Sequence, residues 1–198
     1  MSDQKRPYKM KRRAEQEAET RLRITESAVA LHGSLGPART SVSAVAEHAG
    51  VRRSTVYRHF PDEEALFGAC SAHWAQTYPL PDIDAWRGVV DHDERLATAL
   101  SEMYGYYRGG EEMLTNLLRD RATVPIVGQL MGAYDRFQAA AVEILLAGRG
   151  LRGRARVRVR AAIGHALAFT TWRDLIRAQA LDDEAAAELM SGLVAAAR

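Results

Sequence analysis

Basic and hydroxyl side chains gather between residues 52 and 59, in a pattern that suits contacts with nucleic acid. Residues 52–55 read Arg-Arg-Ser-Thr. An arginine can donate two hydrogen bonds to a guanine edge, and a threonine can contact a thymine methyl group or a phosphate. Residues 57–59 read Tyr-Arg-His and could bond the phosphate oxygens that fix the register of a protein on DNA. The segment therefore has the chemistry of groove reading.

Local sequence signals predict the helices that would present these side chains. Ser41 is a favourable N-cap for a first short helix. Gly50 stands where the C-terminus of that helix favours a left-handed residue. A second short helix follows over residues 53–59, and Asp62 is the expected N-cap of a third. The inward-facing apolar positions of the first helix are Val42, Val45 and Ala46. Two short helices joined by a tight glycine-containing turn form a helix-turn-helix.

The charge of the chain is distributed unevenly. Residues 1–60 contain 12 Lys and Arg against 6 Asp and Glu, a net charge of +6. The remaining residues contain 15 against 19, a net charge of −4. A basic N-terminal third suggests an anionic partner for that third alone, either nucleic acid or an anionic membrane surface. The alternative for residues 41–60 is a surface helical hairpin whose arginines are only solvated.

The extreme N-terminus is the most basic part of the chain. Residues 1–13 contain one acid, Asp3, and six basic residues: Lys5, Arg6, Lys9, Lys11, Arg12 and Arg13. We expect residues 1–13 to form a flexible basic arm that tracks phosphates or enters the minor groove. The alternative is a disordered, solubilising tail.

Five short segments of the N-terminal third together form a recognisable sequence pattern. They are Ile24-x-x-x-Ala28-x-x-Leu31, Thr40-Ser41-Val42, Val45-Ala46-x-x-Ala49-Gly50-Val51, Thr55-Val56-Tyr57-x-His59-Phe60 and Ala65-Leu66. With these residues the chain resembles the TetR/AcrR family of transcriptional regulators over roughly residues 14–75. The resemblance implies an all-α homodimer, with an N-terminal three-helix DNA-binding domain and a C-terminal helical-bundle domain for dimerisation and ligand sensing.

Two residues depart from the family pattern. Arg52 stands where Ser or Thr usually caps the recognition helix, and Glu63 stands where a basic residue commonly touches phosphate. We expect a DNA-binding domain over residues 14–77 and a second domain over 78–198. The expected DNA-binding residues are Ser41, Val42, Ser43, Arg52, Arg53, Ser54, Thr55, Tyr57, Arg58 and His59.

The C-terminal half has helical periodicity throughout. A linker is expected at residues 78–82, because two prolines so close together cannot continue a helix. Gly109-Gly110, Pro125 and residues 148–153 are expected to separate the helices. The last two helices are predicted over about 154–180 and 182–197. Their alanines, together with Ile163, Leu167, Leu189 and Leu193, suggest a four-helix dimer interface.

Aromatic and methionine side chains are frequent in this half. They could line an apolar cavity between helices, with tyrosine hydroxyls orienting a guest molecule. The alternative is an ordinary hydrophobic core. The candidate ligand-binding residues are Met103, Tyr107, Tyr134, Phe137, Phe169 and Trp172.

Other function classes have weak support. The 198 residues, 47% hydrophobic and 26% charged, have the composition of a globular chain, and no uncharged apolar run reaches the length of a membrane span. Residues 148–153 match G-x-G-x-x-G, but a dinucleotide site also needs a preceding strand and a parallel sheet. The arginine run from 149 to 160 is expected to be a solvated helix start paired partly with acids. We expect no enzyme activity, no cofactor, no metal and a cytoplasmic location.

The sequence thus predicts a ligand-responsive transcriptional repressor that binds a palindromic DNA operator as a homodimer. Two alternatives stay open. The same fold could regulate through a protein partner, or as an activator, without a small molecule. Less favoured is a nucleotide-binding enzyme that uses residues 148–153.

Overall fold

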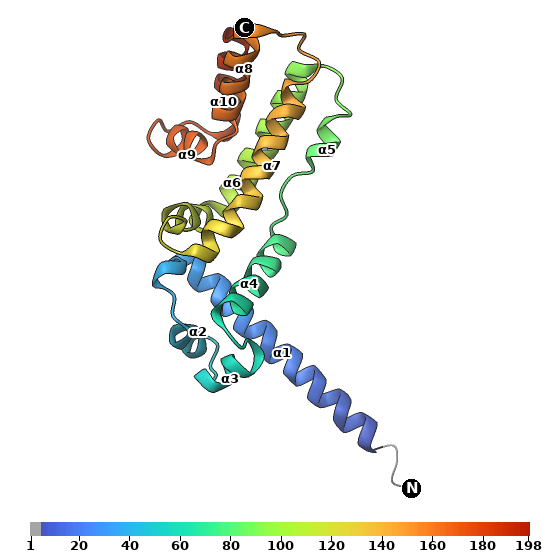
Figure 1. Cartoon of the computed structure of the whole chain (residues 1–198), viewed down its shortest axis with the longest axis vertical. Coiled ribbons are helices and arrows are strands. Elements are labelled where there is room, and N and C mark those ends of the chain that lie inside the picture. Colours follow the sequence, from blue (N-terminus) through green and yellow to red (C-terminus); the bar gives the residue numbers. More distant parts are fainter. Residues whose placement is uncertain (1–4) are drawn as a thin grey trace. The chain divides into compact units, whose positions relative to one another are not determined.

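The computed structural model describes residues 5–198, with side chains from Met10 onward, and confirms the predicted all-α fold (Figure 1). These residues fall into two compact units. The first contains the chain up to Thr77 together with Thr115–Val127, and the second contains Tyr78–Leu114 and Gly128–Arg198. The helices of the described residues are α1 (Lys5–Ser34), the 3-10 helix η1 (Pro37–Arg39), α2 (Val42–His48), α3 (Arg53–His59), α4 (Glu63–Thr77), α5 (Ile83–Trp86), α6 (His92–Asp120), α7 (Pro125–Leu146), α8 (Gly153–Ala166), α9 (Phe169–Arg177) and α10 (Asp183–Ala196).

The first unit is built on the C-terminal half of α1. This helix packs against α2 and α4, and α2 packs against α3. The core that joins them contains Ile24 and Ala28 of α1, Val45 of α2, Val56 of α3 and Leu66 of α4. Burial of these side chains holds α3 in place through one face and leaves its other face exposed.

The predicted caps of the helix-turn-helix are all present. The Ser41 hydroxyl accepts a hydrogen bond of 3.1 Å from the Ala44 amide, and the Asp62 carboxylate accepts one of 2.7 Å from the Ala65 amide. Gly50 has a φ of 65°, which a residue with a side chain rarely adopts. The Arg52 side chain makes no capping hydrogen bond at the start of α3, as its departure from the family pattern suggested.

The helix α1 begins earlier than predicted. Residues 1–4 of the expected flexible arm lie outside the described residues, and residues 5–13 form the first turns of α1. Ion pairs between residues four apart support this part of the helix, from Lys11 to Glu15 at 4.0 Å and from Arg13 to Glu17 at 3.2 Å. The expectation of a flexible segment up to residue 13 is therefore corrected to a helix from Lys5.

The first unit also includes the end of α6, which the sequence did not indicate. The Asn116 side-chain amide donates to the carbonyl of His32 at 3.1 Å and to that of Gly33 at 2.5 Å. One Asp120 carboxylate oxygen accepts a hydrogen bond of 3.0 Å from the Ala38 amide. The last turn of α6 is thus hydrogen-bonded to the end of α1 and to η1.

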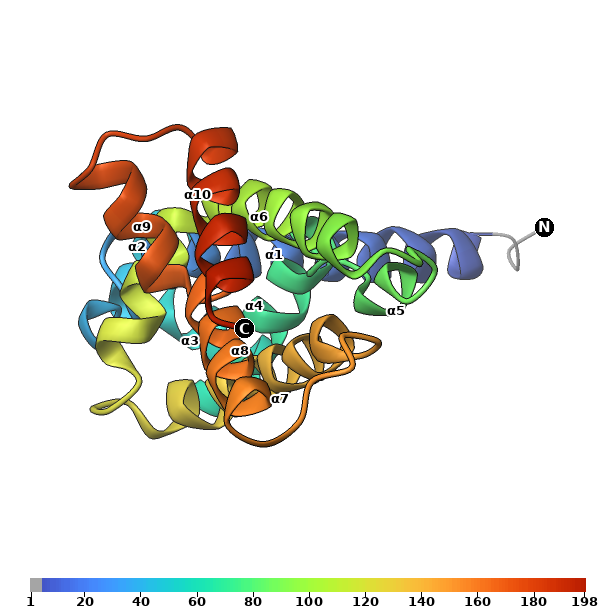
Figure 2. The same ribbon diagram turned by 90° about the horizontal axis from the view of Figure 1, so that it is seen from above.

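The second unit is centred on α6 and α7. The buried Arg95 of α6 donates to the carbonyls of Ile144 and Ala147 at the end of α7, both at 3.2 Å. These bonds add donors at the C-terminal carbonyls of α7, where the Ile144 carbonyl also accepts a hydrogen bond of 3.3 Å from the Ala147 amide. The helices α8 and α10 of this unit lie side by side (Figure 2).

Two of the predicted helix boundaries in this unit are wrong. Gly109-Gly110 does not end a helix, since α6 runs through both residues. A Cβ atom on Gly109 would overlap the Tyr78 ring, so this glycine permits close packing and does not break the helix. The predicted helix 154–180 is divided into α8 and α9 around Leu167 and Ala168. No helix of the described residues is both long and apolar enough to cross a bilayer.

Candidate functional site

The helix α3 has one anchored face and one exposed face. Val56 is 1% exposed and packs in the core of the first unit. On the other side Arg52, Arg53, Ser54 and Arg58 are exposed. The candidate residues of α3 are therefore brought together on one surface, which α1, α2 and α4 support from behind.

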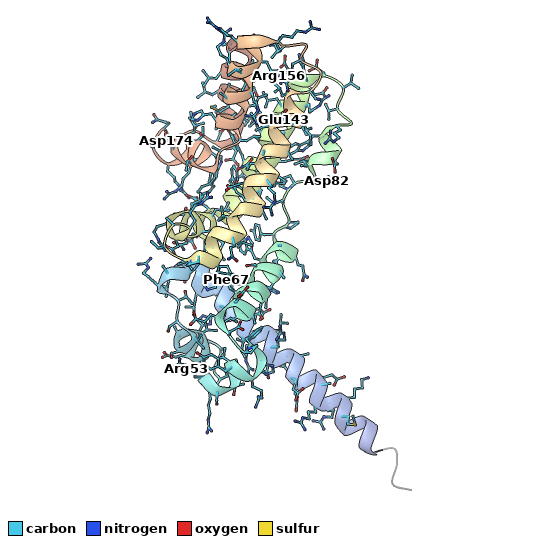
Figure 3. The ribbon with its side chains drawn as sticks, in the orientation of Figure 1. Arg53, Phe67, Asp82, Glu143, Arg156 and Asp174 are labelled. Atoms are coloured by element: carbon cyan, nitrogen blue, oxygen red, sulfur yellow. The ribbon has the colours of Figure 1, made fainter. Side chains whose placement is uncertain are left out.

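Arg53 and Tyr57 lie one helical turn apart and contact each other. The Arg53 guanidinium donates a hydrogen bond of 3.1 Å to the Tyr57 hydroxyl, and its Cζ atom lies 5.4 Å from the centre of the ring. The hydrogen bond from Arg53 to Tyr57 raises the pKa of the arginine above its usual value, and the charge of Glu63 adds to this. Arg53 therefore keeps its charge on the exposed face of α3 (Figure 3).

The C-terminal end of α3 is fixed by a residue that the sequence did not single out. Arg21 of α1 donates to the His59 carbonyl at 2.6 Å, and its guanidinium lies 4.1 Å from the centre of the Phe60 ring. A cation at the C-terminus of a helix is favourable because the carbonyl groups there are unpaired. The only sequence signal was that Arg21 precedes Ile24 by one turn of α1.

The His59 side chain, predicted to contact phosphate, is half-buried. Its Nε2 atom is buried and has no hydrogen-bond partner within the described residues. Burial lowers the pKa of His59, and the nearby Arg58 and Arg21 lower it further. The imidazole is consequently neutral at pH 7, and a phosphate contact from His59 would have to use Nδ1.

The structure divides the candidate residues at the start of α2. Ser41 and Ser43 are exposed, and Ser41 caps the helix. Val42 is only 7% exposed because it packs in the core. A DNA contact from the Val42 side chain is therefore excluded, although the same residue was correctly predicted to face inward.

The six candidate ligand-binding residues all lie in the second unit, and three of them contact Tyr107. The Tyr107 ring centre lies 5.3 Å from that of Phe169 and 5.7 Å from that of Trp172. Its hydroxyl lies 2.9 Å from the Tyr134 hydroxyl, and the Tyr134 ring stacks on Phe137 at 6.4 Å. Met103 is completely buried one turn before Tyr107. The residues form a connected aromatic cluster.

The polar atoms of this cluster form a network of neutral groups. The Tyr107 hydroxyl donates to the Leu167 carbonyl at 2.5 Å. Gln138 donates through Nε2 to the Tyr107 and Tyr134 hydroxyls, both at 2.7 Å, while its Oε1 atom is buried without a partner within the described residues. Burial raises the pKa of Tyr134 to about 12 and that of Tyr107 well above its usual value, so both phenols stay protonated.

The glycine-rich segment 148–153 connects two helices, α7 and α8. Gly148 and Gly150 have left-handed φ values of 80° and 65°. Between them the buried Arg149 pairs with Asp93 at 2.8 Å and donates to the Leu145 carbonyl at 2.8 Å. A helix thus precedes this segment where a dinucleotide site requires a strand.

The arginine run beyond this segment is paired in part with acids, as expected. Arg156 and Arg160 both contact Glu143 of α7, at 3.3 Å and 2.8 Å. Glu143 and Arg156 are labelled in Figure 3.

The proposed dimer surface differs from the prediction in its members. Ile163 and Leu167 are buried in the core of the second unit and are not available to a partner. Three other apolar residues of α8 and α10 are well exposed: Val157 at 68%, Leu189 at 44% and Leu193 at 52%. We call these three residues the α8–α10 apolar patch.

Comparisons with known proteins agree with this geometry. Residues 24–70 match the family model described as bacterial regulatory proteins, tetR family. No curated protein sequence matches the chain. Among solved structures, a TetR-like transcriptional regulator from Rhodococcus sp. RHA1 is 20% identical, with a TM-score of 0.62, over 88% of this chain and 93% of the other.

Two further structures have the same fold. NalD, the secondary repressor of the MexAB-OprM multidrug efflux pump in Pseudomonas aeruginosa, is 20% identical, with a TM-score of 0.60, over 92% of this chain and 97% of its own. The regulator FadR from Bacillus subtilis, in complex with stearoyl-CoA, is 18% identical, with a TM-score of 0.59, over 89% and 98%. Residues 24–70 are therefore similar to the tetR family of bacterial regulatory proteins, and the chain has the fold of TetR-like transcriptional regulators.

Proposed function

We propose that this chain is a ligand-responsive transcriptional repressor that binds a palindromic DNA operator as a homodimer. The observation that carries the proposal is the exposed face of α3. It presents Arg53 and Tyr57 in contact with each other, while Val56 anchors the opposite face in the core. A short helix held in this way can enter the major groove as a rigid unit.

Within this proposal the residues of α3 have different roles. Arg53 at the start of the helix reads a base edge, with Ser54 and Thr55 beside it. Tyr57 and Arg58 contact phosphates and fix the register. Ser41 and Ser43 at the start of α2 are placed to bond the backbone of the same duplex.

Dimerisation supplies the second reading helix. A palindromic operator presents two half-sites about 34–36 Å apart, and one copy of the chain has one α3. The α8–α10 apolar patch supports an isologous contact, because pairing Val157, Leu189 and Leu193 with their copies removes exposed apolar surface from water.

The aromatic cluster around Tyr107 is the proposed effector site. It offers aromatic faces from Phe169 and Trp172, and neutral hydrogen-bonding groups from Tyr134 and Gln138. Such a lining favours an uncharged apolar molecule, or the apolar part of a larger one, with a group that bonds the buried Gln138 Oε1 or the phenols. The effector acts only if it binds the DNA-bound and DNA-free states with different affinity.

An experiment can distinguish regulation by a small-molecule effector from regulation without one. Apolar compounds, including stearoyl-CoA, which the Bacillus subtilis neighbour binds, are tested for their effect on the DNA affinity of the purified protein. An effector lowers the DNA affinity of the wild type and acts less on Tyr134→Phe. If compounds bind without changing the DNA affinity, the result favours regulation through a protein partner or by activation. We propose no catalytic role, and a repressor would act in the cytoplasm.

The direct test of the function is selection of DNA from a random duplex pool by the purified full chain. We expect a pair of inverted half-sites whose centres are about one or two helical turns apart. Enrichment of no motif, or of a single unrepeated site, would contradict the proposed palindromic operator.

A further inference from the structure

Among the described side chains of α1, none before Ile24 belongs to the core of the first unit. Every residue from Met10 to Glu19 is exposed, and continuous burial of α1 begins only at Ile24. Beyond the three-helix core the helix continues past α3 (Figure 1). From Lys5 to Arg23 it is about 28 Å long at 1.5 Å per residue. Burial of apolar side chains among residues 10–19 therefore does not account for this helical extension.

Charge is segregated along the extension. Six basic residues and no acid occur between residues 5 and 14, whereas Glu15, Glu17 and Glu19 follow immediately. The first turn of α1 contains no acidic residue. Cations at the N-terminus of a helix oppose the helix dipole, which is positive at that end. The arrangement is unfavourable for the free protein and favourable beside an anion.

The basic positions also have a preferred side. At 3.6 residues per turn, position 13 precedes Ile24 by about three turns and position 6 precedes it by five turns. Both positions share the side of α1 on which Ile24 packs in the core. Position 9 lies within about 60° of both, whereas positions 11 and 12 lie about 100° or more from both. The core-facing side of α1 thus becomes a basic stripe, at positions 6, 9 and 13, where the core ends.

The recognition helix lies next to this same part of α1. Arg21, one turn before Ile24, donates to the carbonyl of His59, the last residue of α3. The basic stripe begins two turns before Arg21. A duplex that contacts α3 would therefore have its phosphates close to the line along which the stripe extends.

We propose that the first turns of α1 bind phosphates of the duplex that α3 reads, outside the operator half-site. The inference rests on the proposed DNA-binding function. It assigns the stripe to DNA because the stripe is basic, continues from the DNA-binding core and leads away from α3. The contact is sequence-independent, and from Lys9 to Arg23 it extends the reach of the protein by about 20 Å.

Two single substitutions test the stripe with a matched control. Arg13→Gln removes one cation on the stripe and the ion pair with Glu17. Lys11→Gln removes one cation on another side and the equivalent ion pair with Glu15. The dependence of log K on log salt is measured on a 40-base-pair duplex of random sequence, with circular dichroism as a check of helix content. Arg13→Gln should flatten the slope by about 0.9 for each phosphate that the variant no longer neutralises, whereas Lys11→Gln should change it by less than half as much. Equal slopes for the two variants would overturn the proposal.

A second readout separates this proposal from the proposed function itself. The wild type and the variant Arg6→Gln/Lys9→Gln/Arg13→Gln are compared on selected operator DNA with and without ten flanking base pairs on each side. The wild type should lose affinity when the flanks are removed, and the variant should bind both duplexes alike while keeping the base preference of the operator. Two results would contradict the assignment to DNA. In the first, the wild type binds equally tightly with and without the flanks. In the second, the stripe binds anionic lipid vesicles, and the variant has the same DNA affinity as the wild type. Loss of all base preference in the wild type would instead contradict the proposed function.

Discussion

The Arg53 guanidinium donates a hydrogen bond to the Tyr57 hydroxyl at 3.1 Å, and both residues are exposed on α3. A long arginine side chain at a surface has many rotamers, and a contact one turn away restricts them. When DNA approaches, less conformational freedom remains to be lost. Within the proposed function, Tyr57 is therefore a positioning residue for Arg53 in addition to contacting phosphate.

Substitution of Tyr57 by Phe removes the hydroxyl and keeps the ring. We expect the discrimination at the base that Arg53 reads to fall about 3-fold to 10-fold, the effect of one ordinary hydrogen bond. The measurement is the affinity for operator duplexes that differ at that base. If Tyr57→Phe leaves the discrimination between bases unchanged and lowers the affinity for all sequences equally, the hydroxyl contacts phosphate only.

The carboxylate of Asp120 makes stability depend on pH. Its hydrogen bond with Arg119, followed by the bond from the Ala38 amide, holds the pKa of Asp120 below its usual value of 3.8. A carboxyl group with a lowered pKa contributes stability above the unfolded pKa and loses it as the pH falls through the folded pKa. Asp120→Asn should therefore cost roughly 1–3 kcal/mol at pH 7, and the difference from the wild type should shrink below about pH 4.

Urea denaturation of the wild type and Asp120→Asn at several pH values measures this difference. The nearby His32 also destabilises the fold in acid, because burial lowers its pKa to about 4 and the unfolded chain binds the proton first. That effect begins below pH 6.5 in both proteins, and below about pH 4 it is larger in Asp120→Asn, because the charge of Asp120 raises the pKa of His32 in the wild type. A difference between them that stays constant from pH 7 to pH 3 would contradict the role of the carboxylate.

Helix boundaries in the first unit were predictable because their causes are local. Ser41, Gly50 and Asp62 each act on backbone groups within four residues of themselves. The spacing of Arg53 and Tyr57 would also have indicated their contact. Arg21 is different, because its role depends on the return of the chain to α1 at His59.

Errors in the second unit have distant causes. The division between α8 and α9 occurs where the hydroxyls of Tyr104 and Tyr107 bond the carbonyls of Ala166 and Leu167, some sixty residues away along the chain. No glycine or proline lies between Ala166 and Phe169, and Gly164 lies within α8. The inclusion of Thr115–Val127 in the first unit likewise depends on bonds from Asn116 to carbonyls more than eighty residues away. Local propensity does not contain this information.

The α8–α10 apolar patch gives a test of the proposed dimer. A charged side chain in the centre of an apolar contact would be buried without a partner, so Leu193→Glu should give a monomer that keeps its helical content and binds the operator at least about 100-fold more weakly. Val90 is 92% exposed and lies outside the patch, so Val90→Glu is the matched control and should remain dimeric. Sedimentation at micromolar concentration measures the mass. A monomeric wild type would exclude the palindromic mechanism.

The specificity of Arg53→Ala tests most directly whether α3 reads DNA. Affinities of the wild type and the variant are measured on the selected operator, on the operator altered at single bases, and on a scrambled duplex of the same length, all at one salt concentration. We predict that Arg53→Ala costs roughly 1–3 kcal/mol on the operator, loses the preference at one base position of each half-site and changes the affinity for the scrambled duplex much less. If Arg53→Ala and the wild type rank the operator variants in the same order of affinity, the claim that α3 reads DNA through this residue is contradicted.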